Sequence, residues 1–394
     1  MILNLQSLID SLKLLLPLVA KRSTIPILTH VRIAAIPGTD IQKGSLLLIG
    51  TDLEVGIIVA TPMEIGQELD VCVPLRQFTA LLGSLDGLMI ELSRNGYLLA
   101  VKCGSFIANL PLMDSANFPE IPTAPFKTVT LPGATLARFI RQTSFAISKE
   151  ESRFTLNGAL LSFGEQAMIA TDGYRLAIAS GLGVEDQTAG RHLVGKLPLE
   201  ILASWLTNQS VEFAADNSHQ FFILNSSTGT ITLVARKLTG NFPDYQRVLK
   251  DSAYTGTVEV SEILAFLRSV ALFTDTHYSL VRLAFVPGRI AITGESLELG
   301  SAECSVTCLY DGPEITVALN AIYLIGALTA VQGLSAKFGV TNSTTKVEIS
   351  DDNYRCVIMP LRTRANSSAP SRHRRRHPGP SLLPSPHMPR PEAR

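Results

Sequence analysis

The sequence predicts an α+β protein built from three repeated domains. The first observation behind this is a strand-and-turn motif that occurs three times. Its fullest copy spans residues 168–178, where an apolar strand enters the polar turn Asp172-Gly173 and leaves through a second strand. Related stretches place Thr51 120 residues before Thr171, and Thr293 122 residues after it. This period is too long for a solenoid repeat and matches the length of a small domain.

The second observation is that each copy holds a strand followed by an amphipathic helix, twice over. The expected strands are 1–5, 70–73, 128–131, 192–194, 257–260 and 315–318. The helices that follow them are expected over 8–19, 75–82, 136–147, 199–206, 263–270 and 321–328. Ser261 is a predicted N-cap for the fifth helix. Short alternating strands with Gly, Asn and Asp turns follow every helix, so each domain is a doubled strand–helix–strands unit.

Domain boundaries are predicted from a second repeated motif, the tripeptide Asn-Phe-Pro. Asn117-Phe118-Pro119 and Asn241-Phe242-Pro243 lie 124 residues apart, each near the end of a copy. The predicted domains are therefore 1–125, 126–254 and 255–363, followed by a tail over 364–394.

Composition indicates a globular body followed by a basic tail. Hydrophobic residues make up 46% of the 394 residues and charged residues only 17%. The net charge of zero is unevenly distributed, because residues 364–394 contain seven Arg and one acid, Glu392. The 27 basic and 33 acidic residues that remain give the body a charge of about −6. We expect the proline-rich tail to be disordered, and any DNA-binding surface of the body to be local.

Enzyme and cofactor motifs are incomplete or absent. Residues 190–196 match the G-x-x-x-x-G-K phosphate loop, but Leu197 replaces the Ser or Thr that would bind Mg²⁺, and an expected strand covers 191–194. Neither G-x-S-x-G nor H-E-x-x-H occurs. The five cysteines form no C-x-x-C pair, which favours buried thiols over a metal or redox site at Cys304 and Cys308. The sequence predicts no catalytic residue, metal or cofactor.

Apolar segments are too short or too polar for membrane insertion. The run from Leu14 to Ala20 is preceded by Asp10 and Lys13 and lacks a cleavage site, so we interpret it as a helix. Residues 317–331 are fewer than the ~18 needed for a span. We expect a soluble, cytoplasmic protein.

Basic residues recur on or beside corresponding predicted helices. Any one of them fits a solvated helix face, but recurrence on related helices favours a shared surface that neutralises phosphates. The recurring residues are Lys13, Lys21, Arg22, Arg76, Arg138, Arg141, Lys196 and Arg268.

Six short motifs together resemble the bacterial sliding clamp family, the β subunit of DNA polymerase III. They lie at residues 22–28, 50–54, 156–158, 171–177, 242–245 and 359–362, so that the resemblance covers residues 1–363. It implies the DNA clamp fold and a head-to-tail homodimer, whose six domains close into a ring around double-stranded DNA. It further implies a processivity factor without enzymatic activity, which tethers the DNA polymerase III core and other clamp-binding proteins and is placed on DNA by an ATP-driven clamp loader.

The resemblance also implies three sets of functional residues. A hydrophobic pocket between the second and third domains would bind short partner peptides through Leu156, Thr171, Gly173, Tyr174, Arg175, Leu176, Pro243, Arg247, Val248, Val347, Val357, Met359, Pro360, Leu361 and Arg362. The DNA-binding residues would be Arg22, Arg76, Arg138, Arg141, Arg153 and Lys196. The dimer interface would contain Phe106, Ile107, Leu272 and Phe273.

Two departures from the family pattern leave alternatives open. Lys346 stands where the family usually has a small polar residue near the pocket. The tail after Arg362 extends beyond the usual end of the family, and the sequence does not assign it a role. A specialised second clamp, for example one that confers resistance to a clamp-binding antibiotic, fits the same fold. A docking scaffold that no longer encircles DNA, and more distantly a nucleotide hydrolase using Lys196, come from other classes of protein.

Overall fold

The computed structural model describes residues 1–20, 22–38, 44–184, 186, 189–226, 229–275 and 278–362. The chain divides into a unit Met1–Leu361, which contains every described helix and strand, and a second unit Arg362–Arg394. The predicted tail over 364–394 lies outside the described residues.

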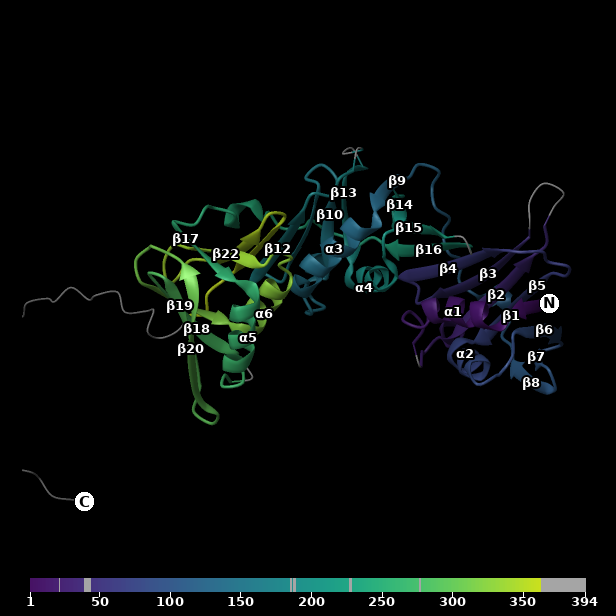
Figure 1. Cartoon of the computed structure of the whole chain (residues 1–394). Helices are drawn as coiled ribbons and strands as arrows, with labels where there is room; N and C mark the ends of the chain where they lie inside the picture. Colours follow the sequence, from purple (N-terminus) through teal and green to yellow (C-terminus); the bar gives the residue numbers. More distant parts are fainter. Residues whose placement is uncertain are drawn as a thin grey trace, which may run out of the picture. The chain divides into compact units, whose positions relative to one another are not determined.

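Three repeats follow one another, and in the described part of the chain each has two α-helices and eight strands (Figure 1). The first repeat contains β1 (Ile2–Asn4), α1 (Leu5–Leu15), β2 (His30–Ile36), β3 (Ser45–Thr51), β4 (Val55–Pro62), β5 (Leu69–Pro74), α2 (Leu75–Gly83), β6 (Met89–Asn95), β7 (Leu98–Cys103) and β8 (Phe106–Pro111). The second contains β9 (Val129–Pro132), α3 (Gly133–Thr143), β10 (Gly158–Ser162), β11 (Ala167–Thr171), β12 (Arg175–Ser180), β13 (Arg191–Gly195), α4 (Lys196–Trp205), β14 (Ser210–Ala215), β15 (His219–Ser226) and β16 (Gly229–Arg236).

The third repeat contains β17 (Tyr254–Glu259), α5 (Val260–Ala271), β18 (Leu280–Val286), β19 (Arg289–Ser296), β20 (Gly300–Leu309), β21 (Ile315–Asn320), α6 (Ala321–Thr329), β22 (Ser335–Val340), β23 (Val347–Asp351) and β24 (Tyr354–Ile358). Short 3-10 turns connect some of these elements: η1 (Pro26–Thr29), η2 (Ser115–Asn117), η3 (Ser144–Ala146), η4 (Phe154–Leu156) and η6 (Gln246–Val248). The predicted α+β class with doubled strand–helix–strands units is confirmed. The boundaries at 125 and 254 stay predictions.

The strands form antiparallel sheets that continue from one repeat into the next. β1-β6-β7-β8 stands alone, while β5-β2-β3-β4 joins β16-β15-β14-β9. In the third sheet, β13-β10-β11-β12 joins β24-β23-β22-β17, which leads on to β20-β19-β18-β21. We call the pairing of β4 with β16 junction 1–2, and the pairing of β12 with β24 junction 2–3.

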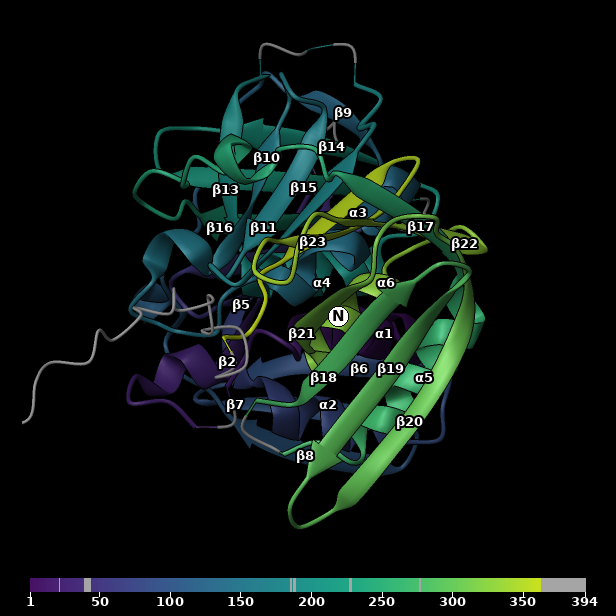
Figure 2. The same ribbon diagram turned by 90° about the vertical axis from the view of Figure 1, so that its left-hand side faces the viewer.

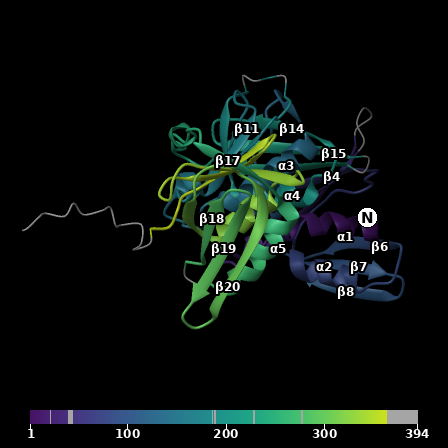
Figure 3. The ribbon, with the colours of Figure 1, turned by 60° about the vertical axis from the view of Figure 1, so that its left-hand side comes forward.

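Paired helices pack against the sheets and complete the hydrophobic core. α1 contacts α2, α3 contacts α4, and α5 contacts both α6 and the long β19–β20 hairpin (Figures 2 and 3). Each helix buries one apolar face, as with Leu8, Leu12 and Leu15 of α1, which meets the core cluster. The sequence pattern therefore places the helices on one side of each repeat's sheets.

Helix ends differ from the predictions in detail. Asn4 caps α1 by accepting a hydrogen bond from the Ser7 amide, but α1 ends at Leu15, and Val19 is buried beyond the helix. α4 begins at Lys196 rather than at residue 199. The predicted N-cap of α5 is wrong: Glu259 holds that position and Ser261 lies within the first turn, where its hydroxyl donates to the Glu259 carboxylate.

Candidate functional site

The motif at residues 171–175 forms a rigid turn at one end of junction 2–3. The Asp172 Oδ1 atom accepts hydrogen bonds from the amides of Tyr174 and Arg175, both at 3.0 Å. The Thr171 hydroxyl accepts from the Gly173 amide and donates to the Arg175 carbonyl. Gly173 has a φ of +89°, which glycine adopts without strain. The Met359 amide then donates to the Tyr174 carbonyl, so the turn fixes Tyr174 beside Met359.

Junction 1–2 repeats this backbone frame. Asp52 accepts from the amides of Glu54 and Val55, the Thr51 hydroxyl bonds the Leu53 amide and the Val55 carbonyl, and the Arg236 amide donates to the Glu54 carbonyl at 2.8 Å. Here Leu53 takes the left-handed position with a φ of +82°, which costs a non-glycine residue free energy. The two junctions therefore share one main-chain design.

Their side chains differ in a way that singles out junction 2–3. At junction 1–2 an exposed ion pair joins Glu54 and Arg236 (2.9 Å) and Leu53 is 52% exposed, while a Cβ on Gly56 would lie only 2.8 Å from Ile121, whose side chain fills that space. At junction 2–3 the corresponding positions are Tyr174 and Met359, which are 53% and 43% exposed. Exposed aromatic and Met side chains on a fixed backbone are typical of a surface that binds a partner.

The floor beneath this surface is a small separate core. Leu176 and Val357, paired across β12 and β24, are buried with Leu160, Ala167 and Ile169. The segment that connects the second and third repeats covers them with Phe242, Tyr245 and Leu249. Leu176 and Val357 therefore support the surface from below. The exposed apolar side chains that a partner could contact are those of Tyr174, Val248 and Met359. We call these three residues, with the buried floor, the junction surface.

The other residues predicted for the pocket fall into three groups. Thr171 and Gly173 shape the turn, as described. A second group is exposed or half-buried: Leu156, Pro243, Arg247, Pro360, Leu361 and Arg362, the last of which is the first residue of the second unit. Val347 is different, because it is fully buried and belongs to the main core, opposite Ile358.

Arg175 acts as a cross-link between elements. Its Nε donates to Asp172 Oδ2 at 3.0 Å, and both side chains are largely buried. The guanidinium also stacks over the rings of Tyr323 on α6 (4.2 Å) and Phe145 in η3 (5.2 Å). Gly326 leaves room for this arrangement, since a Cβ there would lie 3.2 Å from Phe145. Arg175 thus ties β12 to the third repeat.

Sequence reasoning missed Phe145, Tyr323 and Phe154. The first two are brought to Arg175 only by tertiary packing, and no local pattern marks them. Phe154 in η4 is strongly exposed and lies two residues before Leu156. Arg153, predicted to bind DNA, lies near the junction surface: it donates to the Asp172 carbonyl and its guanidinium lies 5.9 Å from the Tyr174 ring.

The remaining predicted DNA-binding residues have unequal freedom. Arg76 donates to the carbonyls of Leu16 and Val19 beyond the end of α1, and Arg138 donates to those of Ser180 and Gly181. Burial lowers the pKa of Arg138. Lys196 lies 3.6 Å from Glu200. Arg22 and Arg141 are exposed and, in the described part of the chain, have no side-chain hydrogen bond or ion pair, so their guanidinium groups are not committed to other groups of the protein. Lys21 lies outside the described residues.

The predicted interface residues lie at the ends of the series of repeats. Phe106 and Ile107 are exposed on β8, an edge strand of the first repeat. Leu272 is 74% exposed just after α5, and Phe273 beside it is half-buried. Exposed apolar residues next to an unpaired strand edge favour association.

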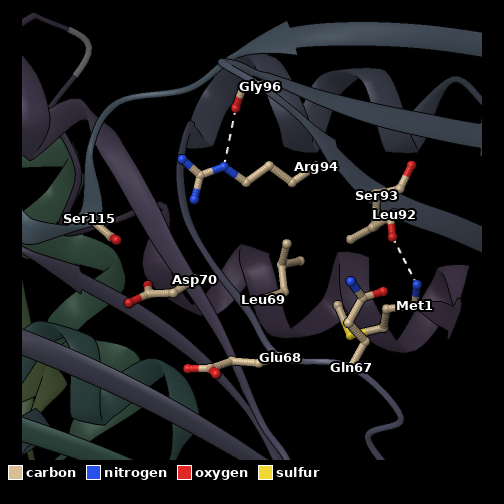
Figure 4. Close-up of a pocket in the computed structure, with 10 residues that line it drawn as sticks. All are labelled: Met1, Gln67, Glu68, Leu69, Asp70, Leu92, Ser93, Arg94, Gly96 and Ser115. Atoms are coloured by element: carbon tan, nitrogen blue, oxygen red, sulfur yellow. Dashed lines mark hydrogen bonds between the residues drawn. The ribbon is translucent and has the colours of Figure 1, made fainter.

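A polar recess of about 560 Å³ lies in the first repeat (Figure 4). Most of its charged groups have partners: Asp70 pairs with Arg32 at 2.8 Å, Arg94 Nε donates to the Gly96 carbonyl, and the Met1 amine donates to the Leu92 carbonyl. Hydrogen bonding from Arg32 lowers the pKa of Asp70, which keeps this pair ionised. None of the predicted site residues lines the recess.

No cluster of three or more metal-ligating side chains occurs in the described residues, where Cys304 and Cys308 are free thiols. Burial raises the pKa of Cys308 to about 11, so it is a poor nucleophile or ligand at neutral pH. Residues 191–195 form β13, not a phosphate-binding loop. Within the described residues, no helix combines the length and apolar character needed to cross a membrane.

Three repeats joined edge to edge by paired strands, with an exposed aromatic and Met surface at junction 2–3, define a protein of the clamp type. Residues 1–122, 130–244 and 247–362 match the N-terminal, central and C-terminal domains of the DNA polymerase III beta subunit. The chain belongs to this family.

Relatives in sequence and structure agree with this assignment. The beta sliding clamp of Pseudomonas putida is 28% identical over 91% of this chain and 98% of its own length, and that of Chlamydia muridarum is 27% identical over 87% and 93%. The crystal structure of the DNA polymerase III subunit beta from Pseudomonas aeruginosa is 26% identical, with a TM-score of 0.84 over 92% of this chain and 99% of that one.

Proposed function

We propose that this protein is a DNA sliding clamp: two copies form a ring around duplex DNA and tether the replicative polymerase and other partners to it. The observation that carries the proposal is the rule by which the repeats join. At both junctions, the last strand of one four-stranded layer (β4 or β12) pairs with the last strand of the other layer in the next repeat (β16 or β24).

Applied once more, the same rule pairs β20 with β8 of a second copy. In the described part of the chain, β8 has a neighbour on one side only, and residues 300–307 of β20 pair only with β19, because β17 reaches just Cys308 and Leu309. These two edges are the open ends of the series. A head-to-tail contact of this kind closes into a ring when the rotations sum to a full turn. Six repeats in two copies, as the family resemblance implies, would close it.

The apolar residues near these edges supply the contact energy. Phe106 and Ile107 lie on β8, and Leu272 and Phe273 follow α5, which packs against β20. Sedimentation equilibrium should therefore give a mass of about 85 kDa, twice the 42.5 kDa of one chain. A stable 42.5 kDa species at micromolar concentration would count against the ring.

A closed ring needs no base-specific contact to remain on DNA. Phosphate contacts hold a protein on the duplex without fixing it at one sequence, so the ring can slide. This function involves no reaction and no cofactor, and the junction surface supplies the attachment point for short peptide segments of polymerases, of the clamp loader and of other partners. DNA replication places the protein in the cytoplasm of a bacterial cell.

Salt dependence tests which residues face DNA. The double variant Arg22→Ala/Arg141→Ala should weaken binding to a labelled duplex equally for different sequences. Removing each side chain that neutralises a phosphate should lower the slope of log K against log salt by about 0.9. Arg138→Ala is the control, because its guanidinium is engaged with backbone carbonyls. An unchanged slope in the double variant would place the DNA-facing surface elsewhere.

A scaffold that docks proteins without encircling DNA is the second candidate. It is favoured by Arg76 and Arg138, which donate hydrogen bonds to carbonyls of the protein itself, so that fewer basic side chains are free to contact DNA. The two candidates differ in topology: only a ring is retained on circular DNA and lost from linear DNA.

A further inference from the structure

The segment over residues 242–253, which connects the second and third repeats, covers one face of the sheet at junction 2–3. We call it the connector. Its first part packs Phe242, Tyr245 and Leu249 on the buried floor, and the Tyr245 hydroxyl donates to Glu165 at 2.8 Å. Within it, η6 carries Arg247 and Val248, two residues predicted to contact a partner. The position of the connector therefore sets one side of the junction surface.

The second part of the connector lies over a layer of charge. Glu348 on β23 accepts from Lys346 Nζ at 2.7 Å and from an Arg355 terminal nitrogen at 2.8 Å, while Arg355 Nε lies 2.6 Å from its other oxygen. Burial raises the pKa of Glu348, but the hydrogen bonds from Arg355 and Lys346 outweigh it, so that the pKa is lowered and the carboxylate stays ionised at neutral pH. The layer is thus a fixed ionic cluster.

Arg355 links this cluster to the connector. The terminal nitrogen that bonds Glu348 also donates to the Leu249 carbonyl at 3.3 Å. Leu249 directly follows η6, and its amide donates back to Gln246 within that turn. A guanidinium can hold both carboxylate oxygens of Glu348 and the Leu249 carbonyl at once because it presents several donors in one plane, an arrangement that a single lysine nitrogen does not offer.

Close packing against Gly339 and a hydrogen bond fix the far end of the connector. A Cβ on Gly339 of β22 would lie 2.6 Å from Ser252 Oγ and 3.4 Å from Glu348 Cβ, so only glycine leaves room for the connector here. The Ala253 amide donates to Thr341 Oγ1 at 3.0 Å. The connector is held at Leu249 and again at residues 252–253, with η6 just before the first of these points.

We propose that Arg355 and Glu348 are positioning residues for partner binding: by holding the Leu249 carbonyl they keep η6, and with it Val248 and Arg247, in place over the buried floor of the junction surface. This inference rests on the proposed function, in which the junction surface binds peptides. Lys346 contributes to the same cluster by donating a hydrogen bond to Glu348. Its ammonium group therefore has a structural role at a position where the family usually has a small polar residue.

The test uses full-length protein and one probe. The probe is a fluorescent peptide selected from a random library for binding to the wild-type protein and shown to lose affinity for Met359→Ala. Arg355→Ala should weaken this peptide by about tenfold, since a hydrogen bond to a charged group and the order of the connector are removed together. Amide hydrogen exchange of residues 246–252 should rise in the same variant.

Arg32→Ala is the matched control. Arg32 pairs with Asp70 in the first repeat, and its side chain is 30% exposed against 31% for Arg355, but it lies away from the connector. It should leave peptide affinity within about twofold. If Arg355→Ala fails to fold, Arg355→Lys keeps one bond of the two and should lower affinity by about threefold.

Two results would overturn the inference. Unchanged affinity with faster exchange in the connector would show that the junction surface does not depend on η6. Reduced affinity with unchanged exchange would show that Arg355 contacts the peptide directly. If every selected peptide is indifferent to Met359→Ala, the junction surface itself is not the partner site, and the inference falls with it.

Discussion

Replacing Leu272 and Phe273 with alanine should convert the dimer into monomers. Both residues follow α5, next to the open edge of β20, and Leu272 exposes most of its side chain in the single chain. Truncating an apolar anchor at an interface typically costs ~2 kcal/mol or more, and a ring of two copies contains the interface twice. Sedimentation velocity at micromolar protein should show the change directly.

A matched control exists at the other exposed apolar surface. Met359→Ala removes a comparable side chain without touching β8, β20 or α5, and should sediment as the wild-type dimer does. If the Leu272→Ala/Phe273→Ala variant also sediments as a dimer, the subunits meet elsewhere and the edge rule does not extend beyond one chain.

Met359→Ala should weaken binding of a partner peptide roughly thirtyfold. Truncating such a contact costs ~2 kcal/mol, and every 1.4 kcal/mol of binding free energy changes the dissociation constant tenfold. Met359 is an exposed thioether held by the bond of its amide to the Tyr174 carbonyl, so the substitution removes side-chain contact and leaves the backbone frame intact. A peptide titration monitored by fluorescence anisotropy measures the effect.

Arg236 provides the control for this second substitution. It occupies the corresponding backbone position at junction 1–2, where its amide donates to the Glu54 carbonyl. Arg236→Ala should leave peptide affinity unchanged, because it alters junction 1–2, where Ile121 fills the space beside Gly56, and leaves Tyr174 and Met359 untouched. Equal losses in the two variants would mean that the partner surface is not confined to junction 2–3.

The repeat architecture could be predicted from the sequence because its determinants are local. Alternating strands, helical apolar faces and the Thr-Asp turns at residues 51 and 171 each depend on a few neighbouring residues. The turn bonds of Asp52 and Asp172 span two or three residues, so their recurrence in the sequence predicts recurrence in the fold. The helix ends were less predictable, as Ser261 shows.

The site was less predictable because it depends on contacts between distant residues. Nothing near Arg175 in the sequence indicates that Tyr323 and Phe145 stack on it, nor that Arg138 and Arg76 donate to carbonyls far along the chain. Val347 and Val357 look alike as strand residues, yet one lies in the main core and the other in the floor of the junction surface. Side-chain direction in a paired strand decides between them.

Retention on circular DNA tests the central proposal most directly. The wild-type protein, placed by a clamp loader on a nicked circular plasmid and passed through a gel-filtration column in high salt, should stay with the DNA and leave it when the plasmid is cut once. The Leu272→Ala/Phe273→Ala variant should be absent from both forms. Equal retention of the wild-type protein on circular and linear DNA, or none on either, would contradict a closed ring and favour a scaffold.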